Sequence, residues 1–358
     1  MFFENSRCVN CGHALGFLPQ LLDLNALEPT DGADFRALTP AADGLQYKRC
    51  ANYDTSAVCN WMVSGADAGS YCAACRLNEI VPDLSIPENQ DRWQQLERAK
   101  RRLIYTLLKL RLPLDAEPTD GRPALRFRFL SDTIPGVPVL TGYENGLITV
   151  NSAEADDVLR EQRRVSLHEP LRTLLGHFRH EIAHYYWDRL IVDSFWLERF
   201  REVFGDERTD YAAALRLHYE KGPEPDWPTR GVTAYASAHP WEDWAETWAH
   251  YLHIVDTIET AAGFGLTLRP DHPAAQSMIA DPGSAAKDEA GFDLILATWF
   301  PLTYALNSLN RGMGLSDLYP FVLSQGAITK LRFIHEVIAE CRLEPAPPRA
   351  RPSVTCAG

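Results

Sequence analysis

The sequence predicts an α+β protein in which a small cysteine-rich module precedes a mostly helical domain with a small sheet. Six of the eight cysteines fall within the first 75 of the 358 residues. Two segments in the middle of the chain have the pattern of strands, and from about residue 170 the pattern is helical almost throughout. The length suits two domains, because a domain usually has about 100–200 residues.

The composition is that of a globular protein with an excess of acidic groups. Hydrophobic residues make up 46% of the chain, charged residues make up 23%, and the formal net charge is −13. A chain that binds nucleic acid over its whole surface is usually basic. The charge therefore argues against nucleic acid as the main partner.

The chain is expected to be cytoplasmic and to have no membrane partner. Its N-terminus shows no basic region followed by an apolar stretch, which is the pattern of a secretory signal. The longest charge-free segment, residues 294–310, contains Pro301 and is too short to cross a bilayer of about 30 Å. In a reducing compartment, clustered cysteines more often hold metal than form disulfides.

Two Cys-x-x-Cys pairs organise the predicted module of residues 1–78. The first pair is Cys8 and Cys11, and the second is Cys72 and Cys75. Each pair places two thiolates on one tight turn, and four thiolates suit a tetrahedral structural zinc ion. Such a site supplies folding free energy that a small module lacks. We therefore predict one structural zinc site formed by these four residues.

Two cysteines of the module remain outside these pairs. Cys50 and Cys59 are either buried free thiols or parts of a second or mixed metal site, and the sequence leaves both interpretations open. Six thiolates do not divide into two four-ligand sites without another donor such as His13. Iron is an alternative to zinc, since four thiolates can also hold it.

The segment after the module begins with a helix and two strands. Apolar residues at helical spacing predict a long helix over residues 88–112, which Pro113 ends. Residues 125–130 alternate with a period of two, and residues 147–150 are rich in strand formers. These two strands predict the small sheet.

The remainder of the second domain, residues 79–344, is predicted to be helical. Pro and Gly separate most of the apolar periodic segments, which is typical of helix boundaries. Helices are predicted over residues 171–192, 195–204, 207–221, 240–262, 292–306 and 319–341. Residues 345–358, which begin with a run rich in proline and arginine, are predicted to be a disordered tail.

One of these helices contains the pattern His-Glu-x-x-His. His180 and His184 are four residues apart, so both imidazoles lie on one helix face about one turn apart and can bind one metal ion. Glu181 lies beside them, where it can accept a proton from a water molecule and pass it to a leaving amine. The pattern is that of a catalytic zinc site, and the alternative is a set of polar residues on a helix whose hydrogen bonds are satisfied without metal.

A catalytic zinc needs a third protein ligand and an open position for water. Glu242 lies early in the helix predicted at 240–262, and Glu246 lies one turn further on the same face. Two carboxylates on a face that is otherwise apolar are costly to bury without a cation or hydrogen-bond partners. Glu242 is the preferred third ligand, and Asp243 is the alternative.

The combination of motifs resembles the gluzincin metallopeptidases, most closely their lethal-factor-like and MtfA-like branch. The resemblance rests on His-Glu-x-x-His and on a later Tyr-x6-Glu-x-x-Ala-Glu segment that begins at Tyr235. It implies His180, His184 and Glu242 as zinc ligands, with Glu181 as general base. It also implies that Tyr235 polarises the scissile carbonyl and stabilises the oxyanion.

The same resemblance implies that Glu246 orients a histidine ligand. Thermolysin-type gluzincins have Asp at the position that corresponds to Glu246, so the chain departs from that branch there.

Most of the chain also looks like a bacterial family of zinc-binding metallopeptidases that carry an N-terminal zinc ribbon. This resemblance rests on the cysteine module together with the segment from His180 to Trp187. It implies a zinc ribbon in residues 1–78 and a zincin-like domain in residues 79–344. It further implies two zinc ions, one structural and one catalytic, and a peptide or protein as substrate.

The alternative is a non-enzymatic, zinc-stabilised interaction protein whose ribbon binds a protein or nucleic-acid partner. In that case the second metal site would be structural, and a structural site is usually closed by a fourth protein ligand. Glu181 and Tyr235 favour the enzyme, because a purely structural site needs neither of them.

Overall fold

The structure is a computed structural model of the full chain. It describes residues 3–32, 34–119, 121–132, 139–160 and 173–342. The predicted disordered tail, residues 345–358, lies outside the described residues.

The N-terminal part folds as a five-stranded antiparallel sheet in which each strand pairs with the next along the chain. The strands are β1 (Ala14–Leu18), β2 (Asp23–Pro29), β3 (Phe35–Ala37), β4 (Gln46–Arg49) and β5 (Met62–Ser64). Leu18, Leu27 and Tyr47 belong to a small apolar cluster on this sheet. The sequence predicted a loop-rich module here, so the sheet is an addition to that prediction.

A second, four-stranded sheet lies against the helices, in the order β6-β7-β9-β8. Its strands are β6 (Asn78–Ile80), β7 (Arg126–Leu130), β8 (Gly142–Glu144) and β9 (Leu147–Asn151). Asn145 and Gly146 connect β8 to β9, and both have positive φ, as a tight two-residue hairpin requires. Strands β7 and β9 confirm the two predicted strands.

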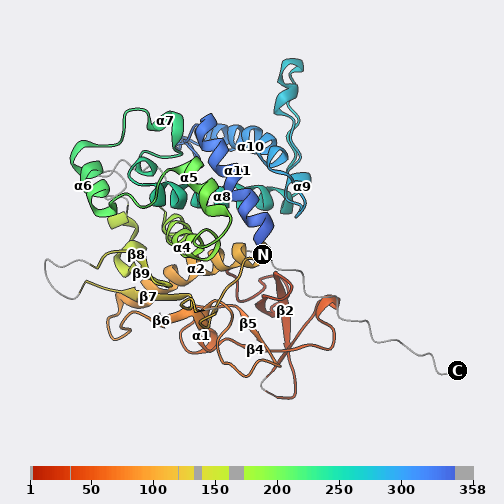
Figure 1. The fold of residues 1–358 in the computed structure, drawn as a ribbon. Helices are drawn as coiled ribbons and strands as arrows, with labels where there is room; N and C mark the ends of the chain where they lie inside the picture. The colour runs from red at the N-terminus through yellow and green to blue at the C-terminus, as the bar shows by residue number, and fades with distance from the viewer. Residues whose placement is uncertain (1–2, 33, 120, 133–138, 161–172, 343–358) are drawn as a thin grey trace.

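The helices from α4 onward form the upper layer in Figure 1, and the helical content confirms the mostly helical prediction. The longer ones are α2 (Glu88–Lys109), α4 (Leu174–Leu190), α5 (Trp196–Phe204), α6 (Tyr211–Lys221), α8 (Pro240–Gly263), α10 (Phe292–Gly312) and α11 (Gln325–Cys341). The described residues also form three short helices, α1 (Ala51–Asp54), α7 (Trp227–Arg230) and α9 (Pro282–Ala285). Helix α11 begins six residues later than predicted, because Ser324 caps its N-terminus by accepting a hydrogen bond from the Ala327 N–H.

Helix α2 joins the two parts of the molecule. It lies between the N-terminal strands and the helical layer in Figure 1. Its Trp93 and Leu96 belong to the same buried cluster as Cys50 and Cys72 on one side and Phe178 of α4 on the other. The ribbon and the helical part therefore share one hydrophobic core.

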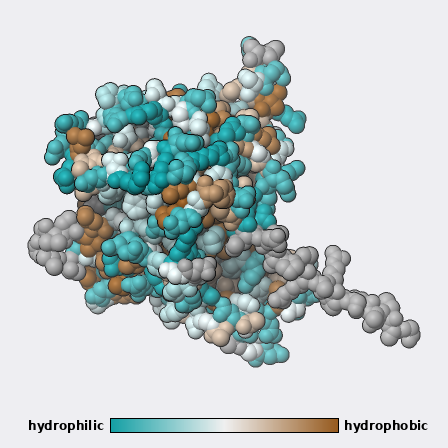
Figure 2. All heavy atoms as spheres, in the orientation of Figure 1, coloured by the Kyte–Doolittle hydropathy of each residue, from teal (hydrophilic) through white to brown (hydrophobic). Residues whose placement is uncertain are grey.

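The surface is mixed in polarity. The face in Figure 2 is largely hydrophilic, with brown atoms in several separate groups. Within the described residues, every helix is too short or too polar to cross a membrane.

Candidate metal centres

Helices α4 and α8 carry the candidate catalytic residues and pack directly against each other. Thr173 caps α4 by accepting a hydrogen bond from the Gly176 N–H, and Pro240 occupies the first turn of α8. The Trp244 indole of α8 donates a hydrogen bond of 2.8 Å to the Ala183 carbonyl of α4. This contact fixes the two helices beside each other at the level of the histidines.

The two helices bring His180, His184 and Glu242 together. One donor atom from each residue lies within 4.8 Å of the donors of the other two. Nε2 of His180 lies 3.0 Å from Oε2 of Glu242, and Nε2 of His184 lies 3.8 Å from Oε1. Glu242 is only 1% exposed. Two imidazoles and a carboxylate at this spacing match the donor set that zinc takes in catalytic sites.

The charges in this cluster suit a cation. His180 lies between two carboxylates, since its Nδ1 is 2.8 Å from Oε1 of Glu246. Burial alone would lower the pKa of His180, but its hydrogen bonds with Glu242 and Glu246 raise that pKa well above the ordinary value. Burial would raise the pKa of Glu242, but its partners lower it to about 2. One buried and one half-buried carboxylate therefore favour a positive charge here, which a protonated His180 or a divalent metal ion can supply.

Glu181 and Tyr235 border this cluster. Glu181 makes no hydrogen bond or ion pair with the described residues, and burial raises its pKa to about 7. Tyr235 begins the 3₁₀ turn η4 (Tyr235–Ser237), and its ring centre lies 6.0 Å from that of His180. A carboxylate without a partner can accept a proton, and a tyrosine at this place can donate a hydrogen bond to a substrate.

Asp243, the alternative third ligand, is held elsewhere. Its carboxylate accepts hydrogen bonds from Lys330 of α11 and from the Thr247 hydroxyl, the latter at 3.4 Å. The charge of Asp243 is thus paired without a metal ion. The geometry favours Glu242 over Asp243 as the third donor.

Sequence reasoning missed two residues that support the carboxylates. The Tyr211 hydroxyl donates a 2.7 Å hydrogen bond to Oε1 of Glu242, and the Thr233 hydroxyl donates a 2.6 Å bond to Oε2 of Glu246. Both lie in segments whose sequence contains no metal-binding pattern. Only the need of a buried carboxylate for donors could have pointed to such residues.

The second cluster consists of four buried cysteines: Cys50, Cys59, Cys72 and Cys75. Sγ of Cys59 lies 3.7 Å from Sγ of Cys72, and the backbone N–H groups of Cys72 and Trp61 point to Sγ of Cys50 and Cys59 at 3.4 Å. Four thiols with backbone donors fit a tetrahedral zinc ion. Of the two interpretations left open for Cys50 and Cys59, the structure favours metal ligands.

The predicted ligand set of Cys8, Cys11, Cys72 and Cys75 is therefore wrong in its first pair. Cys8 and Cys11 lie on an exposed turn before β1, and Nδ1 of His13 lies 3.2 Å from Sγ of Cys11. They are absent from every group of three or more candidate ligands among the described residues.

Strand pairing explains the difference. Arg49 of β4 pairs with Met62 of β5, and this register brings the neighbouring Cys50 and Cys59 together at one end of the two strands. The spacing of Cys-x-x-Cys pairs says nothing of such a long-range register.

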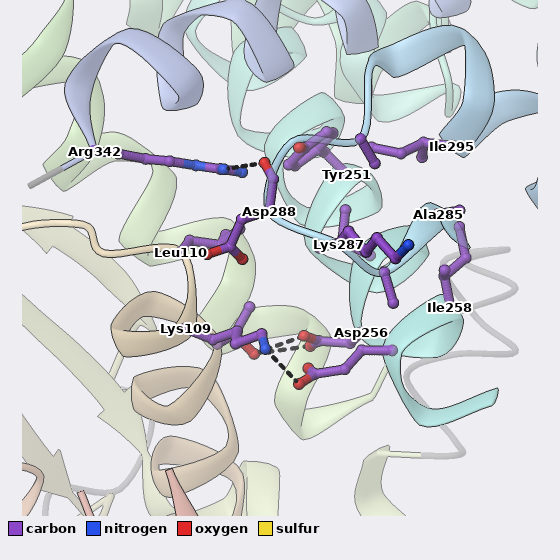
Figure 3. Close-up of a pocket in the computed structure, with 15 residues that line it drawn as sticks. Lys109, Leu110, Tyr251, Asp256, Ile258, Ala285, Lys287, Asp288, Ile295 and Arg342 are labelled. Atoms are coloured by element: carbon purple, nitrogen blue, oxygen red, sulfur yellow. Dashed lines mark hydrogen bonds and ion pairs between the residues drawn. The ribbon is translucent and has the colours of Figure 1, made fainter. Parts of the chain in front are cut away.

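A separate small surface pocket lies between α2, α8 and the segment from Ala285 to Ala290, and Ile295 of α10 also lines it (Figure 3). Its α8 lining begins at Tyr251, five residues beyond Glu246, so it is distinct from the metal clusters. Its charged groups are largely paired: Lys109 lies 3.6 Å from Glu259, and Arg342 donates to the Asp288 carbonyl at 2.6 Å.

Comparison with known families finds two matches along the chain. Residues 89–337 match the family described as "Putative zinc-binding metallo-peptidase". The chain belongs to this metallopeptidase family. Residues 1–86 match a zinc-ribbon domain, which precedes the metallopeptidase part as the sequence predicts.

Relatives resemble the chain over nearly its full length. "Uncharacterized protein Mb2598c" of Mycobacterium bovis and "Uncharacterized protein Rv2568c" of Mycobacterium tuberculosis are each 43% identical to it over 353 residues. The match covers 98% of this chain and 96% of each relative, so both the ribbon and the metallopeptidase part are shared. No solved structure matches the chain.

Proposed function

We propose that this member of the metallopeptidase family is a zinc-dependent peptidase that hydrolyses peptide bonds at the His180–His184–Glu242 cluster. The observation that carries the proposal is the convergence of three zinc-type donors beside a carboxylate, Glu181, that has no partner among the described residues. A structural zinc site usually has four protein ligands, whereas this cluster offers three. The geometry thus supports an enzyme over a purely structural second site.

Each residue of the site has a separate role in the proposed reaction. A bound zinc ion would polarise water and the scissile carbonyl. Glu181 accepts the proton of the attacking water and returns it to the leaving amine, for which a pKa of about 7 is well suited. Tyr235 donates a hydrogen bond to the carbonyl oxygen as negative charge develops there. Glu246 holds His180 through Nδ1.

The four-cysteine cluster has a different role in this proposal. Its thiols are buried, and it lies in the ribbon beside the shared core. We assign it a structural zinc ion, with the helical cluster holding the catalytic one. The substrate is a peptide or protein.

The direct test is cleavage of a peptide library by the zinc-loaded chain. We expect cleavage to stop when a chelator removes the zinc ion of the His180–His184–Glu242 cluster, here called the helical-half zinc. Cleavage should return when zinc is added back. Mass spectrometry of the library identifies the cut bonds. Absence of cleavage by protein that carries two zinc equivalents would instead favour the non-enzymatic interaction protein.

The third ligand can be tested by metal content alone. Glu242→Ala is expected to bind one zinc equivalent fewer than the wild type, because a buried donor of the three-residue cluster is removed. Asp243→Asn is the control, since it removes a neighbouring charge while keeping the size of the side chain. Atomic emission on dialysed protein measures both. Loss of zinc in Asp243→Asn with retention in Glu242→Ala would move the ligand by one position.

A further inference from the structure

Tyr211, the first residue of α6, donates a hydrogen bond to a member of the three-donor cluster, and nothing in the motif pattern assigns it a role. Its hydroxyl donates a 2.7 Å hydrogen bond to Oε1 of Glu242, while Oε2 of the same carboxylate faces His180 at 3.0 Å. A carboxylate that gives one oxygen to a metal ion leaves the other oxygen in need of a donor when it is buried. Glu242 is almost fully buried, and Tyr211 meets that need.

The start of α8 holds Tyr211 in place, rather than the packing of its own helix. Helix α6 buries none of its side chains, and Tyr211 itself is 38% exposed. The Tyr211 ring meets the rings of His239 and Trp241 edge-on, with centres 5.2 Å and 5.8 Å apart. Both of these residues lie within the three residues before Glu242, so the same short segment positions the donor and the acceptor.

The chain that leads into α6 follows the same path along α8. Gly205 ends α5 with a φ of 106°, and a Cβ there would lie 3.3 Å from Pro240. Four residues later, the Thr209 carbonyl lies 3.1 Å from Nε2 of His239. The segment from Gly205 to Tyr211 therefore packs against the start of α8, and the first turn of α8 carries Glu242.

We propose that Tyr211 is a positioning residue for the metal ligand Glu242, an inference that rests on the proposed function. By occupying Oε1, it fixes the rotation of Glu242 and leaves Oε2 directed at His180. Its contribution is then to the affinity of the helical cluster for zinc, and α6 is part of the metal site although it supplies no ligand.

The test compares Tyr211→Phe with Tyr105→Phe. Tyr105 is a matched control, because its hydroxyl donates a 2.6 Å hydrogen bond to Glu259, another glutamate of α8 away from the metal cluster. Zinc retained per chain is followed by atomic emission against rising concentrations of a chelator of known zinc affinity. Each zinc site gives one step in this curve of zinc retained against chelator concentration. The step that is absent in Glu242→Ala belongs to the helical-half site. Circular dichroism confirms that each variant is folded.

We expect Tyr211→Phe to weaken zinc binding at that site by roughly 10- to 100-fold, as loss of a residue that supports a ligand typically does. The four-cysteine step should stay unchanged, and Tyr105→Phe should match the wild type in both steps. At saturating zinc, peptide cleavage by Tyr211→Phe should return to near the wild-type kcat.

Two outcomes overturn this inference without touching the proposed function. In one outcome, the wild type cleaves peptides, and Tyr211→Phe binds zinc as tightly as the wild type does. In the other, zinc affinity is unchanged but kcat falls at saturating zinc, which would place Tyr211 on the substrate instead. If the wild type binds two zinc ions and cleaves nothing, the proposed function fails, while a weaker helical-half step in Tyr211→Phe still supports the positioning role.

Discussion

Glu181→Gln is expected to lower peptide cleavage by roughly 10²- to 10⁴-fold in kcat while leaving both zinc equivalents in place, because general base catalysis contributes a factor of that size. The substitution keeps the shape of the side chain and removes its ability to take a proton. Glu181 belongs to neither metal cluster, so its loss should not release metal.

The measurement combines steady-state kinetics on one cleaved peptide with zinc content of the same sample. Glu202→Gln, an exposed glutamate on α5, is the matched control and should keep the wild-type rate. If Glu181→Gln cleaves as fast as the wild type, the base is another group. If it loses a zinc equivalent together with activity, Glu181 supports the metal rather than the proton transfer.

The helical site could be predicted from the sequence because its information is local. His180 and His184 are one turn apart on one helix, and helical geometry alone puts their rings side by side. Their ring centres lie 5.1 Å apart. Glu242 lies in a second segment. Its position early in a helix after Pro240, together with the resemblance to gluzincins, allowed it to be predicted as the third ligand.

The four-cysteine site could be predicted only in part, because it depends on strand pairing. The turn that carries Cys72 and Cys75 is local, and both residues lie in the four-cysteine cluster. Cys50 and Cys59 join them through the register of β4 on β5, and the sequence carries no separate sign of that register. Tyr211 was missed for a similar reason, since its partner Glu242 lies 31 residues away.

The buried link between the ribbon and the helical part has a consequence for stability. Glu97 of α2 is fully buried and lies 3.9 Å from Sγ of Cys75, and its other oxygen accepts hydrogen bonds from Asn78 at 2.6 Å and Lys100 at 2.9 Å. The Lys100 ammonium lies 5.6 Å from the ring centre of Phe127 in β7. A chain of contacts thus runs from the cysteine cluster through α2 to the second sheet.

Cys72→Ser is therefore expected to destabilise the whole chain and not the ribbon alone. Cys72 is 1% exposed, and its loss leaves a three-thiol site around a buried hydroxyl. Structural zinc binding is worth about 10–16 kcal/mol in small zinc-finger peptides, and much of that free energy supports the fold. Because the ribbon and the helices share one core, we expect a single unfolding transition at a clearly lower temperature.

Thermal unfolding followed by circular dichroism, with zinc content measured on the same samples, tests this expectation. The control is Cys11→Ser, which removes an exposed thiol outside the cluster and should keep the wild-type transition and the four-cysteine zinc. Two separated transitions in Cys72→Ser, with the helical one at the wild-type temperature, would show that the ribbon is an independent unit. Equal zinc loss in Cys11→Ser would return the first Cys-x-x-Cys pair to the structural site. A single lowered transition would make the ribbon a part of the scaffold that holds α4 and α8, and would argue against a detachable surface for recruiting substrates.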